Sequence, residues 1–137
     1  MQSMAKQEMI ERLGDLGRVN PSLELAVLFG SMARGRARSR SDLDIAVRSD
    51  ELVDLDALYV VLAPRLGTER LDLVDLRTAG SVLAFEVARH GQVLYERDPG
   101  TFRSFQALAS RRYCDMAKLR RAQQRTIRAF LERQGLA

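Results

Sequence analysis

Two aspartates placed two residues apart inside an apolar run constrain this sequence more than any other feature. Asp42 and Asp44 stand in the segment "DLDIAV", residues 42–47, whose other four residues are apolar. Carboxylates are seldom buried without a compensating partner, because removing a charge from water is costly. A fold that takes up this segment as a buried strand must therefore supply that partner.

The spacing of the two aspartates indicates what the partner is. On a strand, residues i and i+2 point to the same face and lie roughly 6–7 Å apart. Two carboxylates side by side repel each other unless a cation lies between them. Mg²⁺ takes oxygen ligands and is commonly held by one or two carboxylates together with substrate phosphates. Asp42 and Asp44 are therefore predicted ligands of Mg²⁺.

A second motif precedes the aspartates and is suited to phosphate. The apolar run "LELAVLFG", residues 23–30, ends in Gly30 and is followed by Ser31. Glycine lets a phosphate approach the backbone, and the first N–H groups of a following helical turn attract an anion. Gly-Ser alone is a weak signal, but here the metal motif follows it. Arg34, in the next turn, is a further phosphate ligand unless its arginine-rich loop is only a solvated surface.

A third acid is expected near the metal, to complete its ligands and to activate the nucleophile. The segment "LDLVDL" offers Asp72 and Asp75. The two residues are three positions apart and therefore face opposite sides of a strand, so only one can join the site. The pattern of residues leaves that choice open.

Strand patterns alternate with helix patterns along the chain, which predicts an α/β fold with a small mixed β-sheet and flanking helices. Residues 1–98 are expected to form the core and residues 99–137 a helical extension of the same domain. The expected strands cover residues 23–30, 42–47, 69–76 and 92–96, and the expected helices cover residues 4–16, 50–66, 80–89 and about 102–133.

Charge and cysteine content indicate the kind of partner and the cellular compartment to expect. The net charge is +4, but residues 103–133 carry nine Lys and Arg against two acids, a net +7, which leaves −3 for the rest. This basic tail suggests an acidic partner, either a protein or a nucleic acid. A lone cysteine, Cys114, favours a reducing compartment, and no apolar run approaches the ~18 residues of a membrane span. We therefore expect a cytoplasmic protein.

Two segments together resemble the minimal branch of the polymerase-β-type nucleotidyltransferases. They are "GSMARGRARSRSDLDIAV" and "LDLVDLRTAGSVLAFEVARHGQVLYERD", and the likeness covers about residues 10–98. The resemblance implies a nucleotidyltransferase fold and two Mg²⁺ ions. It assigns the three catalytic and metal-binding acids to Asp42, Asp44 and Asp72, and the phosphate-binding pair to Gly30 and Ser31.

The minimal branch is similar to antitoxins that are paired with HEPN ribonuclease toxins. This resemblance implies transfer of AMP from ATP to a tyrosine hydroxyl of a cognate HEPN toxin, with the chain as its antitoxin. Three alternatives stay open: an antitoxin that masks its toxin without catalysis, a nucleotidyltransferase acting on a small molecule such as an aminoglycoside, and a nucleic-acid binder acting through the basic tail. The intact acid set argues against the masking antitoxin, and the lack of an acceptor domain in this sequence disfavours the small-molecule enzyme. A nucleic-acid binder would bind with a strong dependence on salt. The oligomeric state is open.

Overall fold

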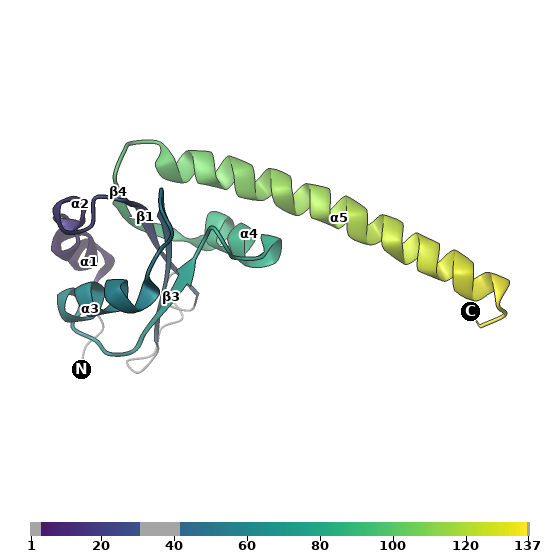
Figure 1. Ribbon diagram of the computed structural model, residues 1–137, viewed down its shortest axis with the longest axis horizontal. Coiled ribbons are helices and arrows are strands. Elements are labelled where there is room, and N and C mark those ends of the chain that lie inside the picture. Colours follow the sequence, from purple (N-terminus) through teal and green to yellow (C-terminus); the bar gives the residue numbers. More distant parts are fainter. Residues whose placement is uncertain (1–3, 31–41, 137) are drawn as a thin grey trace.

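The computed structural model describes residues 4–30 and 42–136 and contains a four-stranded sheet between two layers of helices (Figure 1). The strands lie in the order β3-β2-β1-β4. Strand β1 is antiparallel to β2 and to β4, whereas β2 is parallel to β3, so the sheet is mixed as predicted. The bounds are Leu23–Phe29 for β1, Leu43–Ser49 for β2, Leu71–Asp75 for β3 and Gln92–Glu96 for β4.

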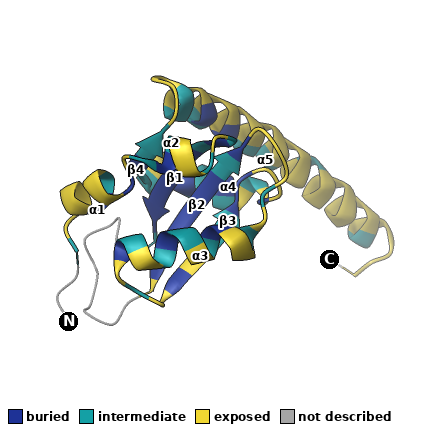
Figure 2. Ribbon diagram, turned by 60° about the vertical axis from the view of Figure 1, so that its left-hand side comes forward, coloured by how far each residue is buried: buried dark blue, intermediate teal, exposed yellow. Residues whose placement is uncertain are grey.

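Alternating side chains divide the core into two clusters, one on each face of the sheet. Leu28 and Ile45 point to the face covered by α1 (Lys6–Arg12), α2 (Leu16–Val19) and α3 (Leu55–Leu66). Val27 and Ala46 point to the opposite face, which α4 (Ser81–His90) and α5 (Thr101–Arg133) cover. Figure 2 shows the buried strands between these exposed helical layers. The α/β fold class is thereby confirmed.

The first two predicted helices differ from the structure at their ends. The helix expected over residues 4–16 stops at Arg12, and a turn around Gly14 separates it from the short helix α2. The helix expected from residue 50 begins at Leu55, because the Asp54 side chain accepts a hydrogen bond from the N–H of Ala57 at 3.1 Å. An aspartate in this position satisfies an N–H that has no partner within the helix.

The C-terminal helix α5 is a single element of 33 residues that extends well beyond the sheet (Figure 1). It begins at Thr101, after Gly100, which agrees with the helix predicted from about residue 102. The Glu96 side chain at the end of β4 accepts a hydrogen bond from the N–H of Phe102 at 2.8 Å. Only Phe105 and Ala109 are buried in this helix, so its far half has no contact with the core. The division of the chain at residue 98 stays a prediction.

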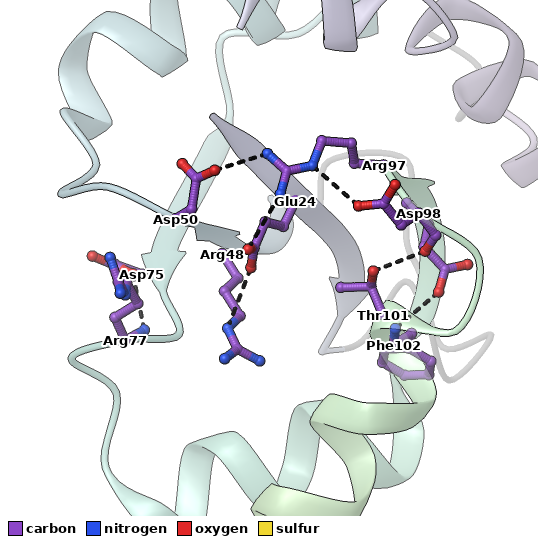
Figure 3. Close-up of polar contacts among 10 residues, drawn as sticks. Glu24, Arg48, Asp50, Asp75, Arg77, Arg97, Asp98, Thr101 and Phe102 are labelled. Carbon is purple, nitrogen blue, oxygen red and sulfur yellow. Dashed lines mark hydrogen bonds and ion pairs between the residues drawn. The ribbon is translucent and has the colours of Figure 1, made fainter. Parts of the chain in front are cut away.

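One end of the sheet, where β1 begins and β2 and β4 end, is held by a group of charged residues that we call the Arg97 network (Figure 3). The Arg97 guanidinium donates to Asp50 Oδ2 at 2.9 Å and to the Pro21 carbonyl oxygen at 2.9 Å. The hydrogen bond that Arg97 donates to Asp50 raises the pKa of Arg97. The network consists of Glu24, Arg48, Asp50, Arg97 and Asp98, with ion pairs of 2.9–3.6 Å.

No helix in the described part of the chain is both long enough and apolar enough to cross a membrane. Helix α5 has the length for a span, but it carries nine Lys and Arg and two acids. Its length must therefore be explained in another way.

Candidate active site

The sheet register places two of the predicted acids side by side at the end of the sheet opposite the Arg97 network. Asp44 of β2 is the direct partner of Asp72 in the parallel strand β3, and of Phe29 in the antiparallel strand β1. Phe29 and Ala46 belong to the core cluster under α4 and α5, so Asp44 points to that face of the sheet. The neighbouring residue Val74 packs on the same cluster, which places Asp72 on that face as well.

Gly30 lies directly against Asp44. Its φ of +75° is in the left-handed region, which glycine adopts without strain. A Cβ at this position would also overlap Oδ2 of Asp44 and would lie 3.2 Å from its Cγ. The backbone thus favours glycine, and any other residue would force the Asp44 carboxylate to move. The sequence motif predicted a glycine that leaves room for phosphate, but not this contact, which follows from the pairing of Phe29 with Asp44.

The three acids affect one another electrostatically. Burial raises the pKa of the Asp44 carboxyl above its ordinary value, and the charges of Asp72 and Asp42 raise it further. Asp42 and Asp72 are exposed, whereas Asp44 is partly buried. Within residues 4–30 and 42–136, none of the three carboxylates has a hydrogen-bond or ion-pair partner. The described residues therefore leave this negative charge unpaired, and an added cation can offset it.

Asp75 lies in a different environment from Asp72, as the strand alternation predicted. It pairs with Val47 in the register and is 7% exposed. Its Oδ1 accepts a hydrogen bond from the N–H of Arg77 at 2.9 Å, which closes the turn after β3. This carboxylate already has a structural partner and points away from Asp44. The geometry favours Asp72 as the third acid of the site.

Two predicted nucleotide-binding residues cannot be placed. Ser31 and Arg34 fall within residues 31–41 and lie outside the described residues. The described residues on either side of this segment are Gly30 and Asp42. The roles of Ser31 and Arg34 stay predictions.

The donor set fits Mg²⁺, although the protein side chains do not enclose a metal by themselves. In the described ranges, no group of three or more His, Cys, Asp or Glu side chains is gathered as a metal cage. Mg²⁺ usually needs only one or two carboxylates, since waters and substrate phosphates complete its coordination. The carboxylates of Asp44 and Asp72, on adjacent strands, and of Asp42 nearby provide that number of oxygen donors.

Comparison with known proteins identifies the class. Residues 11–100 match the family described as polymerase beta, nucleotidyltransferase. The chain therefore belongs to the nucleotidyltransferase family, and the predicted family and enzyme class are confirmed. The matched segment contains all four strands and every acid of the candidate site.

Several similar proteins have names that give a more specific activity or assembly than the family description does. The chain is 30% identical over 128 residues to the protein adenylyltransferase MntA of Aphanizomenon flos-aquae (strain 2012/KM1/D3), with 85% of each chain covered. A solved structure of a toxin–antitoxin with AMP-PNP has a TM-score of 0.70 and 30% identity, covering 90% of this chain and 98% of that one. A structure of the tri-AMPylated Shewanella oneidensis HEPN toxin in complex with MNT antitoxin has a TM-score of 0.66 and 29% identity, with the same coverage.

Proposed function

We propose that this protein transfers AMP from ATP to a tyrosine hydroxyl of a cognate HEPN ribonuclease toxin and thereby acts as its antitoxin. The observation that carries the proposal is the pairing of Asp44 with Asp72, with Gly30 directly against the Asp44 carboxylate. A protein that only masked a partner would have no need for adjacent, unneutralised acids. The adenylyltransferase name of a relative at 30% identity supports the choice of AMP.

The proposed roles of Gly30 and the acids follow their positions in the sheet, and those of Ser31 and Arg34 follow the sequence motif. Asp42 and Asp44 are the metal ligands that hold the triphosphate, and Asp72 completes the acid set. Gly30 and Ser31 bind phosphate through the backbone and the hydroxyl group, and Arg34 adds positive charge. Two bound Mg²⁺ ions would neutralise the triphosphate and lower the pKa of the attacking hydroxyl.

The chemical step needs a base because a tyrosine hydroxyl has an unperturbed pKa of about 10. The tyrosine oxygen forms a bond to the α-phosphorus of ATP, and the bond from that phosphorus to the bridging oxygen of the β-phosphate breaks. Pyrophosphate leaves with the electron pair of that bond. The Asp72 carboxylate, exposed beside Asp44, accepts the tyrosine proton and releases it to water.

Mass spectrometry of the toxin tests this proposal. A candidate HEPN-domain toxin is incubated with the protein, ATP and Mg²⁺. We expect the toxin to gain the mass of one or more AMP groups on tyrosine, and the Asp42→Asn variant to produce none. If that variant neutralises the toxin equally well with no added mass, the protein is a masking antitoxin.

The same assay separates the remaining alternative, transfer to a small molecule. An aminoglycoside supplied in place of the toxin should stay unmodified, because the relative that supports the proposal is named a protein adenylyltransferase. We also infer a cytoplasmic location, in which the exposed Cys114 stays reduced.

A further inference from the structure

The far half of α5 presents a row of exposed apolar side chains that the proposed chemistry does not use. We call it the apolar stripe, and it consists of Met116, Leu119, Ile127 and Phe130, which are 41%, 49%, 58% and 52% exposed. Exposed apolar residues in a continuous row are typical of interaction surfaces, whereas isolated ones need no explanation. The structure gives this row no cover from the described residues.

The apolar stripe continues the face by which α5 packs on the sheet. Phe105 and Ala109 are buried against the core cluster that also contains Phe29 and Ala46. Ile127 follows Phe105 by 22 residues, which is about six turns at 3.6 residues per turn. The stripe therefore points in the same direction as Phe105, toward the side of the sheet on which Asp44 and Asp72 lie. In Figure 1, α5 carries this face outward past α4.

The basic residues of the helix lie on the opposite face. Lys118, Arg121 and Arg125 each follow or precede a stripe residue by two positions, and two residues are about half a turn. The apolar stripe and this basic face can thus be changed independently. The sequence alone had suggested the basic face as the partner site, whereas the packing of Phe105 and Ala109 favours the apolar one.

Charge argues against a second copy of this chain as the occupant of the stripe. Residues 103–133 have a net charge of +7 and only two acids, Asp115 and Glu132. Two such helices placed side by side would bring arginines together with few carboxylates to pair them. Arg112 and Arg120 flank the stripe, and Arg120 lies over the Tyr113 ring at 5.9 Å. An occupant with an apolar strip edged by carboxylates fits this surface.

We propose that the protein acceptor docks on the apolar stripe of α5, through an apolar strip flanked by acidic side chains. Docked there, the acceptor lies on the same side of the sheet as Asp44 and Asp72, so that a segment of it can reach the site. The inference rests on the proposed function for the identity of the acceptor, the HEPN toxin. It also explains the length of α5, because the far half of the helix holds the acceptor.

Two matched variants test the docking surface. The stripe variant combines Met116→Gln, Ile127→Gln and Phe130→Gln, and the opposite-face control combines Lys118→Gln, Arg121→Gln and Arg125→Gln. All six positions are exposed, and glutamine is a good helix former, so both variants should keep the fold and the helix signal of the parent in circular dichroism. The rate of AMP incorporation is measured against the concentration of the same candidate HEPN-domain toxin.

We expect the stripe variant to raise the KM for this toxin by about 100-fold with kcat little changed, since hot-spot apolar residues often contribute tenfold or more each. The control should change KM by less than about threefold at physiological salt. Unchanged KM in the stripe variant would overturn the inference, as would a loss confined to the control. A parent dimer in analytical ultracentrifugation that the stripe variant dissociates would assign the stripe to a second copy instead.

A binding measurement separates this inference from the proposed function. Calorimetric titration of the toxin into the Asp44→Asn protein, with and without the stripe changes, requires no transfer. If the parent binds the toxin through the stripe but adds no AMP, the docking inference holds and the transfer proposal fails. If the parent adds AMP and the stripe changes leave both binding and KM as they were, the transfer proposal holds and the docking inference fails.

Discussion

The two ends of the sheet differ in whether their carboxylates have arginine partners among the described residues. At the Arg97 end, Glu24, Asp50 and Asp98 each have an arginine partner within 3.6 Å. At the other end, Asp44 and Asp72 are direct neighbours in the register and have no such partner among the described residues. This difference indicates that the paired acids stabilise the fold and that the unpaired acids can bind a ligand.

Carboxylates placed side by side without a partner lower the stability of the fold. The charges of Asp72 and Asp42 help to raise the pKa of Asp44, which means that the ionised site is disfavoured in the fold. Gly30, with its positive φ, adds a conformational requirement at the same place. Functional sites commonly keep such features because their residues are selected for chemistry, whereas the Arg97 network shows what the same side chains do when they stabilise the fold.

Replacing one acid at each end of the sheet should give the largest difference in transfer activity between two variants. Asp44→Asn removes a charged metal ligand, and we expect transfer to fall by about 10³-fold or more, because bound metal supplies several kcal/mol of transition-state stabilisation. Asp50→Asn, in the Arg97 network, should keep transfer within about twofold. AMP transfer is assayed with labelled ATP and the candidate HEPN-domain toxin. Equal activity of the two variants would remove the distinction between the two ends.

The two aspartates of β3 allow a sharper test within one strand. Asp72→Asn should reduce kcat by about 10²-fold or more, since it removes the carboxylate beside Asp44. Asp75→Asn should retain turnover, because an amide oxygen can still accept the hydrogen bond from Arg77, and stability should change by only about 1 kcal/mol. Single-turnover rates and urea unfolding measure the two effects. The reverse pattern would move the third acid to Asp75.

Glycine substitutions separate backbone strain from displacement of the carboxylate. Gly30→Ala should lower transfer about tenfold per folded molecule, because the new Cβ forces Asp44 to move. Gly100→Ala is the matched control, since Gly100 also has a positive φ of +93° but no atom within 4 Å of the added Cβ. Both variants should lose about 1 kcal/mol of stability. A similar loss of activity in both would mean that general destabilisation, and not Asp44, is responsible.

The smallest expected effect is a pH dependence of stability measured in EDTA. Because the folded pKa of Asp44 is raised, the folded chain binds its proton more tightly, and the free energy of unfolding rises as pH falls through that pKa. Asp44→Asn should therefore be more stable than the parent at pH 7, by less than about 1 kcal/mol, and this gain should vanish toward pH 3–4.

Asp15 provides a control of opposite sign for the same titration. A hydrogen bond from Arg65 lowers the pKa of Asp15, so its ionised form stabilises the fold, and that stability is lost as pH falls through the lowered pKa. Asp15→Asn should be less stable than the parent at pH 7 and should approach it in acid. Chemical unfolding at several pH values measures both differences, and the same sign for Asp44 and Asp15 would contradict the account.

The local parts of the fold could be predicted from the sequence because they depend on short-range patterns. The alternation of apolar residues gave the four strands within a few residues, and the three-residue spacing of Asp72 and Asp75 correctly put them on opposite faces. The start of α3 was missed because Asp54, rather than the earlier acids, caps that helix.

Contacts between residues that lie far apart in the chain could not be predicted from the sequence. The contact of Gly30 with Asp44 depends on the antiparallel register of β1 and β2, and the Arg97 network joins residues from three strand ends. No periodicity marks either feature. Likewise, the basic character of residues 103–133 was visible in the sequence, but only the burial of Phe105 and Ala109 shows which face of α5 lies toward the sheet.

Direct detection of metal binding tests the central claim, that the unpaired acids form a cation site and the paired acids do not. Mn²⁺ takes the oxygen ligands that suit Mg²⁺ and is visible by electron paramagnetic resonance, so it can be titrated with a non-hydrolysable ATP analogue present. The account predicts that the parent and Asp50→Asn bind Mn²⁺ alike and that Asp44→Asn binds it at least about tenfold more weakly. Equal affinity of Asp44→Asn and the parent, or a loss in Asp50→Asn instead, would contradict it.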